Sequence, residues 1–306
     1  MTDNHGMTTV LRRDPLEYHL VDVFTTTALQ GNPLAVVMDT RGLRTEQMQA
    51  IAREFNLSET TFVRRRNADV EAREGVQVRI FTTQEELPFA GHPTLGTASV
   101  LRQAAPETLQ DGCIRLALKV GAIPVRFDGE ELYGEMTQAE PELGRTLERT
   151  EVAGLTGLTL EDLDPLHAPQ VVSTGTAFAI VLLRSEASLA RFRVRHEEAT
   201  PWLRERGARW FYALAPEGGS ERIFRSRMQF YGGEDPATGS AAGCAISYLV
   251  AHGVVAPEVQ VQMKQGIEIG RASELMLRAA LDGSKVVDVR VAGSTVPVAN
   301  GQLFLP

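Results

Sequence analysis

Apolar and polar residues alternate over several short segments of the chain, and this alternation predicts β-strands. In residues 18–25 the apolar positions include Val21 and Val23, and a Gly-Asn-Pro turn at 31–33 separates this segment from a second apolar segment at 34–38. A period of two is typical of strands, and a glycine turn between two such segments favours a strand pair. Further strands in this half are predicted at the end of 56–63 and over 76–82, 114–120, 123–127 and 132–136.

Two helices are predicted in the same half of the chain. In residues 45–55 the apolar side chains recur at helical spacing on one face, and Thr45 is a suitable N-cap. Residues 93–102 are mostly small and follow a turn at Gly91. Pro93 suits the first position of this second helix, because proline has no N–H to leave unpaired there.

The second half of the chain repeats this order of elements. Strands are predicted over 171–176, 177–183, 209–214 and 223–230, a charged helical region over 186–206, and a small-residue helix from the Gly239 turn to His252. Gly31 and Gly175 lie 144 residues apart, and Gly91 and Gly239 lie 148 residues apart. A shared period of this kind predicts two copies of one αβ unit, whereas chance recurrence of short glycine turns is the alternative.

Composition and charge narrow the class of protein. The 306 residues predict about two domains by the usual ~150-residue rule. The net charge of −8 argues against nucleic acid as the main partner and fits a protein that binds small molecules. Two cysteines, Cys113 and Cys244, form no disulfide framework or zinc motif and predict reduced thiols in a cytoplasmic protein. Residues 1–20 lack the apolar core of a signal peptide, and no apolar run approaches the ~18 residues of a membrane span.

The common catalytic motifs are missing from the sequence. It contains no G-x-x-x-x-G-K-[ST] or G-x-G-x-x-G phosphate loop, no H-E-x-x-H zinc motif and no G-x-S-x-G nucleophile motif. The glycine turns at Gly91 and Gly239 instead open helices, and a helix N-terminus can bind a carboxylate or phosphate through free N–H groups. The alternative is that both glycines only allow a tight entry into the helix.

Three ionisable residues in or near these turns are candidates for catalysis. They are Glu59, His92 and Asp235, and one histidine with two carboxylates suits general acid–base chemistry. Each has a plainer interpretation: Glu59 as an exposed turn carboxylate, His92 as a hydrogen-bonded structural histidine, and Asp235 as a helix N-cap before Pro236. No serine–histidine or cysteine–histidine pair indicates covalent catalysis, and no ligand spacing indicates a metal site.

Six segments together resemble the phenazine-biosynthesis PhzF-like family, which has the diaminopimelate epimerase-like fold. The segments are QGNPLAVV (30–37), IAREFNLSETTFV (51–63), RIFTTQEELPFAGHPTLGTA (79–98), SRM (226–228), EDPATGSAAG (234–243) and QGIEIGR (265–271). They are spread over nearly the whole chain, and ELPFAGHPTLGTA with EDPATGSAAG is the most specific combination.

The resemblance implies an α+β fold of two similar domains, each a β-structure wrapped around a central helix, with the active site in the cleft between them. The expected domains are residues 1–137 with a returning strand at about 293–306, and residues 138–292. A homodimer is possible, and a small molecule is the expected partner.

The resemblance also implies roles for residues at matching positions. Glu59 would be the general acid/base that moves a proton, and His92 and Asp235 would be its polar partners. Residues that would hold the substrate and its carboxylate are Asn32, Ser58, Gly91, Gly239 and Ser240. No metal or cofactor is expected. Relatives of this fold that epimerise diaminopimelate use two cysteines in the cleft, and both glycine turns here lack cysteine.

The expected activity is that of a cofactor-independent isomerase that shifts a proton on a small carboxylate-bearing substrate. The best single substrate is a trans-2,3-dihydro-3-hydroxyanthranilate-like compound, which the family would convert by an allylic proton shift. Two alternatives stay open: an epimerase or racemase of an amino-acid-like substrate, and a non-catalytic small-molecule-binding protein with the same fold.

Overall fold

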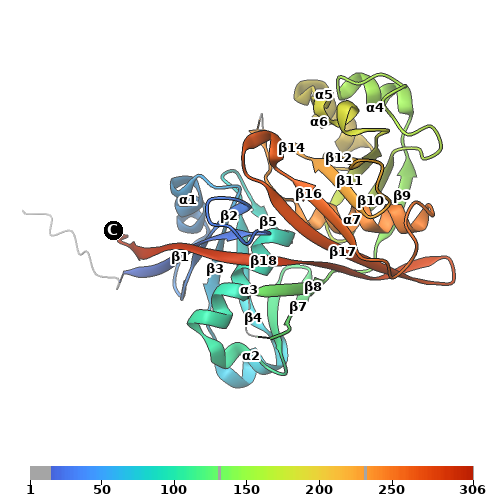
Figure 1. Ribbon diagram of the computed structural model, residues 1–306. Helices are drawn as coiled ribbons and strands as arrows, with labels where there is room; N and C mark the ends of the chain where they lie inside the picture. The colour runs from blue at the N-terminus through green and yellow to red at the C-terminus, as the bar shows by residue number, and fades with distance from the viewer. Residues whose placement is uncertain (1–14, 130–131, 231–232, 306) are drawn as a thin grey trace, which may run out of the picture.

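The computed structural model describes residues 15–129, 132–230 and 233–305, and more of these residues lie in strands than in helices (Figure 1). Residues 1–14 are outside the described part. They belong to the predicted first domain and to the segment 1–20 in which no signal peptide is predicted. The strands of the first half are β1 (Leu16–Val23), β2 (Asn32–Val37), β3 (Glu59–Arg64), β4 (Val76–Phe81), β5 (Glu86–Leu87), β6 (Cys113–Leu118), β7 (Gly121–Phe127) and β8 (Tyr133–Thr137). Its helices are α1 (Thr45–Phe55), α2 (Ala68–Glu74) and α3 (Gly91–Ala104), with a 3-10 turn η1 (Pro106–Thr108).

The second half contains the remaining elements. Its strands are β9 (Glu142–Thr146), β10 (Gln170–Ser173), β11 (Ala177–Leu182), β12 (Trp210–Pro216), β13 (Ile223–Arg227), β14 (Gln229–Phe230), β15 (Gly233–Glu234), β16 (Val261–Gln265), β17 (Ser273–Asp282) and β18 (Lys285–Leu303). Its helices are α4 (Arg149–Leu155), α5 (Glu186–Arg191), α6 (His196–Glu205) and α7 (Gly239–Ala251), with a 3-10 turn η2 (Ile267–Ile269).

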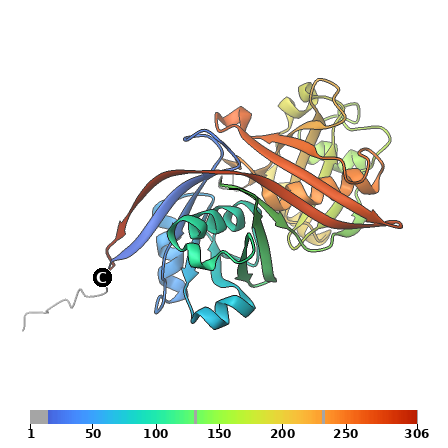
Figure 2. The ribbon, with the colours of Figure 1, turned by 60° about the horizontal axis from the view of Figure 1, so that its bottom comes forward.

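One long strand, β18, joins the two halves (Figure 2). Its first part pairs with β17, its middle pairs with β8, and residues 295–303 pair with β1. The strands β1, β2, β3, β4, β6, β7 and β8 are hydrogen-bonded in that order, so β18 closes them into a ring. The ring surrounds α3, which packs against seven of these eight strands. The predicted domain boundary near residue 137 falls between β8 and β9, and the one near residue 293 falls within β18.

Strand pairing follows the same order in the two halves. From β1 through β2, β3, β4, β6 and β7 to β8, the successive pairs are antiparallel, parallel, antiparallel, parallel, antiparallel and antiparallel. From β10 through β11, β12, β13, β16 and β17 to β18 the order is identical. Helices α3 and α7 occupy equivalent places, after β4 and β13. This is the internal repeat that the spacing of the glycine turns predicts.

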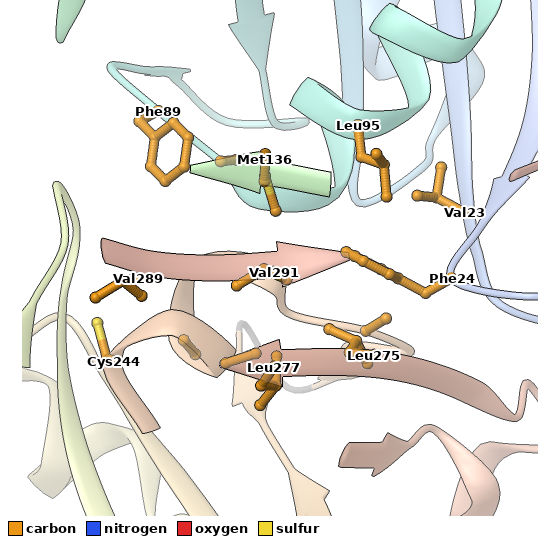
Figure 3. Close-up of a cluster of buried hydrophobic side chains, with 14 of the residues drawn as sticks. Val23, Phe24, Phe89, Leu95, Met136, Cys244, Leu275, Leu277, Val289 and Val291 are labelled. Carbon is orange, nitrogen blue, oxygen red and sulfur yellow. The ribbon is translucent and has the colours of Figure 1, made fainter. Parts of the chain in front are cut away.

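The two central helices are buried because their sequences are small and apolar on every side. All residues from Gly91 to Leu101 in α3 and from Gly239 to Val250 in α7 are buried, the arrangement expected of a helix without a polar face. The hydrophobic core continues from one half to the other across β18. Figure 3 shows Val291 of β18 between Met136 of β8 and Leu277 of β17, all in one cluster of buried side chains.

The structure corrects several local expectations. Arg44, not Thr45, is the N-cap of α1, and its N–H donates to the Gln47 side chain. Pro93 is the third residue of α3, where its missing N–H is equally harmless because the first four N–H groups of a helix have no partner within it. The predicted helical region 186–206 is two helices separated at 192–195, and α2 and α4 were not predicted. No described helix is both long and apolar enough to cross a membrane.

Candidate active site

A narrow cavity lies where α3 and α7 begin, and both halves of the chain line it. Its volume is about 30 Å³, enough for about two water molecules at ~10–15 Å³ each. Polar groups come from Glu59, His92, Asp235, Thr238 and Ser240. The other lining residues are mostly apolar or small: Thr82, Leu87, Phe89, Ala90, Gly91, Thr176, Phe178, Trp210, Met228, Phe230 and Gly239.

Glu59 is the first residue of β3, and its side chain is 15% exposed. It follows α1, whose apolar face packs on the sheet, and lies beside Leu34 of the parallel strand β2. The Glu59 Oε2 atom lies 3.5 Å from His92 Nδ1 and is buried without a hydrogen-bond partner among the described residues. Burial, and then the charge of Asp235, raise the pKa of Glu59 well above its usual range, while Arg209 opposes this. The interpretation of Glu59 as an exposed turn residue is therefore wrong.

His92 is the second residue of α3 and is 3% exposed. Its Nδ1 atom lies 3.2 Å from Asn32 Nδ2, and its Nε2 atom is buried without a hydrogen-bond partner among the described residues. Burial lowers the pKa of His92 to about 3, because the interior disfavours the imidazolium form, and the Pro33 backbone opposes this lowering. His92 is consequently a neutral imidazole at physiological pH.

Asp235 is held by three donors from three parts of the chain. Its Oδ1 atom accepts from Asn32 Nδ2 at 2.8 Å and from Ser58 Oγ at 3.2 Å, and its Oδ2 atom accepts from Thr238 Oγ1 at 2.6 Å. Burial raises the pKa of Asp235 to about 6, and these hydrogen bonds act against that rise. The N-cap of α7 is Thr238, so the interpretation of Asp235 as a helix N-cap is wrong.

The predicted substrate-binding residues fall into two groups. Gly91, Gly239 and Ser240 line the cavity at the two helix N-termini. Asn32 and Ser58 instead contact Asp235, and Asn32 also donates to the Ala237 carbonyl at 2.8 Å. The structure thus brings all eight predicted site residues to one place, although Asn32 and Ser58 lie behind the carboxylate rather than on the cavity wall.

The N-termini of α3 and α7 meet at this cavity. A Cβ built on Gly239 would lie 3.1 Å from the Gly91 Cα atom, so the two helix ends are in backbone contact. The first N–H groups of each helix have no partner within the helix, and the dipole of each helix places partial positive charge here. Two such ends beside an apolar wall form a place that suits the carboxylate of a small ligand.

Sequence reasoning missed the aromatic walls and two buried polar groups. Phe178 and Trp210 lie on β11 and β12, where the alternating pattern does not distinguish a cavity-lining side chain from a core one. Thr238 and Gln265 lie inside the segments EDPATGSAAG and QGIEIGR, but the sequence analysis gives neither residue a role. Their position within these two motif segments is the signal that could have identified them.

Neither cysteine lies on the cavity wall, and no metal cluster is present among the described residues. Cys244 is buried inside α7, where burial raises the pKa of its thiol to about 12. Cys113 begins β6 in the other half of the chain. Within residues 15–129, 132–230 and 233–305, no three His, Cys, Asp or Glu side chains are grouped so that they could hold a metal ion.

The chain is similar to several known proteins over nearly its whole length. The model of a family described as phenazine biosynthesis-like protein matches residues 21–301. A trans-2,3-dihydro-3-hydroxyanthranilate isomerase from Pseudomonas aeruginosa is 38% identical over 299 residues, which cover 94% of this chain and 99% of that protein. A predicted epimerase from the same organism has a solved structure with a TM-score of 0.81 at 32% identity, covering 95% of this chain and 100% of its own.

A more distant likeness concerns the fold alone. A hydroxyproline epimerase from Agrobacterium vitis, solved with bound trans-4-hydroxy-L-proline, has a TM-score of 0.67 at 11% identity, covering 95% of this chain and 93% of its own. The chain therefore has the mixed α/β fold shared by these epimerases and the phenazine biosynthesis-like proteins.

Proposed function

This chain belongs to the family of phenazine biosynthesis-like proteins and is an isomerase, and from that premise we propose that it shifts a proton within a small, carboxylate-bearing ring substrate. The best candidate is trans-2,3-dihydro-3-hydroxyanthranilate, the compound that gives the 38% identical isomerase from Pseudomonas aeruginosa its name. The observation that carries the proposal is the Glu59 carboxyl group, which has an unpartnered oxygen atom 3.5 Å from a neutral His92 at a cavity formed by two helix N-termini.

Glu59 is the group to which we assign the proton transfer. An ionised Glu59 takes a proton from one carbon of the allylic system, the double bond moves, and the same carboxyl group returns a proton to another carbon. A carboxyl group whose pKa is raised toward neutrality can both accept and release a proton, as an isomerase requires. No atom is gained or lost in this reaction.

The remaining residues orient the substrate in this proposal. The carboxylate of the substrate binds the free N–H groups near Gly91 and Gly239, and the ring lies against Phe89, Phe178 and Trp210. His92, neutral because it is buried, contacts the substrate or Glu59 through a hydrogen bond rather than through charge.

We further propose that the two halves act as two domains that must separate to admit the substrate. The cavity of about 30 Å³ is smaller than a six-membered ring with its substituents, and its walls come from both halves. The domains would be the β1–β8 half with the end of β18, and the half from residue 138 to about residue 292.

Incubation of the purified protein with trans-2,3-dihydro-3-hydroxyanthranilate in D₂O tests the proposal. We expect NMR to detect an isomer in which one deuteron has entered at the carbon that gains the proton. Glu59→Gln should abolish this conversion while the protein stays folded. Deuterium exchange with inversion at a single carbon of an amino-acid-like substrate would support an epimerase instead. Absence of both conversion and exchange with either class of substrate would contradict catalysis.

A further inference from the structure

Gln265 is a buried amide, 1% exposed, whose two ends are fully hydrogen-bonded beneath the Asp235–Thr238 turn. It lies at the end of β16. Its Oε1 atom accepts from the Thr238 backbone N–H at 3.1 Å and from the Tyr212 hydroxyl at 3.1 Å. Its Nε2 atom donates to the Asp235 backbone carbonyl at 2.8 Å and to Thr238 Oγ1 at 2.9 Å.

These partners fix the orientation of the amide. A backbone N–H can only donate and a backbone carbonyl can only accept, so Oε1 must face Thr238 N and Nε2 must face Asp235 O. Rotation of the amide by 180° would place two donors together on one side and two acceptors together on the other. The Nε2 group of Gln265 is therefore the donor to the Thr238 hydroxyl.

The orientation of Gln265 in turn fixes the proton of Thr238. A threonine hydroxyl has one proton, and here its oxygen already accepts from Gln265. That proton therefore points to Asp235 Oδ2, only 2.6 Å away. Asn32 is oriented in a similar way, because its Nδ2 group donates to both the Ala237 carbonyl and Asp235 Oδ1.

Both oxygen atoms of Asp235 consequently face donors. A protonated Asp235 would have to direct its own proton toward Asn32, Ser58 or Thr238, where a donor already points. Hydrogen bonds to both oxygens favour the ionised form of a carboxyl group. Glu59 differs in this respect, because its Oε2 atom has no hydrogen-bond partner among the described residues.

We propose that Gln265 and Thr238 are positioning residues that hold Asp235 as an ionised acceptor, and so leave Glu59 as the carboxyl group that carries the mobile proton. The part about Asp235 rests on the hydrogen bonds alone. The part about Glu59 rests also on the function proposed above.

Other titratable groups face Asp235, and all of them are retained in the Thr238 and Gln265 variants below. Glu59 approaches from β3, Tyr212 from β12 and His92 from α3 through Asn32. Glu234 precedes Asp235 on β15 and forms an ion pair with Arg227 at 2.6 Å. The charge of Glu234 raises the pKa of Asp235, whereas the three donors lower it.

Carboxyl titration by NMR tests the proposal without a substrate. The full-length protein is labelled with ¹³C at the side-chain carboxyl groups of Asp and Glu, and Asp235→Asn and Glu59→Gln identify the two signals. Thr238→Val keeps the shape of the side chain and removes its hydroxyl. We expect the pKa of Asp235 to rise by about one to two pH units, because a hydrogen bond to a charged group contributes about 1.5–3 kcal/mol. Thr238→Ser should restore the value of the unmodified protein.

The same titration reports on Glu59. The charge of Asp235 raises the pKa of Glu59, so a more protonated Asp235 in Thr238→Val should lower it. An unchanged Asp235 pKa in Thr238→Val, or an equal shift in Thr238→Ser, would overturn the role of the hydroxyl. If the pKa of Asp235 shifts in Thr238→Val but the pKa of Glu59 does not, the assignment of the mobile proton to Glu59 would be overturned.

A double-mutant cycle tests whether Gln265 acts through Thr238. Gln265→Met keeps the length of the side chain, adds no charge and removes the amide, so the Thr238 proton is no longer directed to Asp235. We expect Gln265→Met to raise the pKa of Asp235 in the native background and to have little effect in Thr238→Val. Additive effects would contradict this role. If these shifts occur but the unmodified protein converts no dihydro-hydroxyanthranilate, the proposed function fails and the positioning role stands.

Discussion

Gly91 and Gly239 touch so closely that a Cβ atom built on Gly91 would lie 2.5 Å from the Gly239 carbonyl carbon. This contact is between the first residues of α3 and α7, the central helices of the two halves. Because neither residue has a side chain, two helix N-termini can share one site. A larger residue at either position would separate the two halves where the cavity forms.

Gly91→Ala is therefore expected to destabilise the protein. The atoms that the new methyl group meets are backbone atoms, which cannot rotate away, and overpacking of this kind costs about 1–3 kcal/mol. Gly154→Ala is the matched control, since Gly154 lies in α4 and its Cβ would meet only the Arg195 guanidinium at 3.6 Å. There alanine should stabilise the helix by up to ~1 kcal/mol. Urea unfolding of both variants measures the difference, and equal stabilities would contradict the close contact.

Glu59→Gln is expected to remove catalysis without unfolding the protein. Glutamine keeps the shape of the side chain but cannot exchange a proton, and loss of a general acid/base typically lowers the rate by on the order of 10²–10⁴. Glu54→Gln, at an exposed position of α1, should leave turnover unchanged. Turnover and melting temperature are measured together on the two variants. Full activity in Glu59→Gln would refute the assignment.

The stability of the protein should depend on pH through Glu59. Its pKa is raised in the folded state, so the folded protein binds this proton more tightly than the unfolded chain does. The resulting stabilisation is fully present below the unfolded pKa of about 4.3 and is lost as the pH rises through the folded value. Relative to native protein, Glu59→Gln should therefore become more stable between pH 5 and pH 8. Denaturant unfolding at pH 5 and pH 8 measures whether the difference in unfolding free energy between Glu59→Gln and native protein grows with pH. Glu54→Gln is the control for the loss of one carboxylate.

His92 should stay neutral across the working range of pH. With its pKa lowered to about 3, the folded state binds this proton more weakly than the unfolded chain, whose histidine has a pKa of about 6.5. Its contribution to stability is present above pH ~6.5 and lost as the pH falls toward 3. In ¹⁵N NMR of labelled histidine, the signals that disappear in His92→Gln should keep the neutral pattern at pH 5. Titration of these signals near pH 6.5 would show that the ring is not buried as described.

Carboxylates should bind at the paired helix ends. The free N–H groups near Gly91 and Gly239 provide the donors and the positive ends of two dipoles. In a titration with anthranilate, the backbone amide signals of Gly91, Gly239 and Ser240 should move together and saturate. The basic segment 64–66 is the contrasting site, and Arg65 and Arg66 there already pair with Glu71 and Glu74. Shifts confined to that segment would argue against the helix ends as the binding site.

The local elements and the residue types of the site follow from the order of residues along the chain. Alternation predicted most strands of the first half and, in the second half, the segments that form β10 to β14, and the small, apolar sequences after Gly91 and Gly239 predicted two similar helices. The motif segments contain Glu59, His92 and Asp235, which the sequence alone marks as candidates for catalysis. These features are local, because the period of a strand or helix and the freedom of glycine are properties of neighbouring residues.

How these residues act on one another depends instead on contacts between distant parts of the chain. Asn32 and Asp235 are 203 residues apart, and they meet because β18 closes the ring around α3 and brings α7 against it. The direction of the hydrogen bonds from Gln265 through Thr238 to Asp235 depends on which backbone groups face the amide, which no pattern of residue types records. The shifted pKa values of Glu59 and His92 have the same origin, since burial is imposed by the packing of both halves around them.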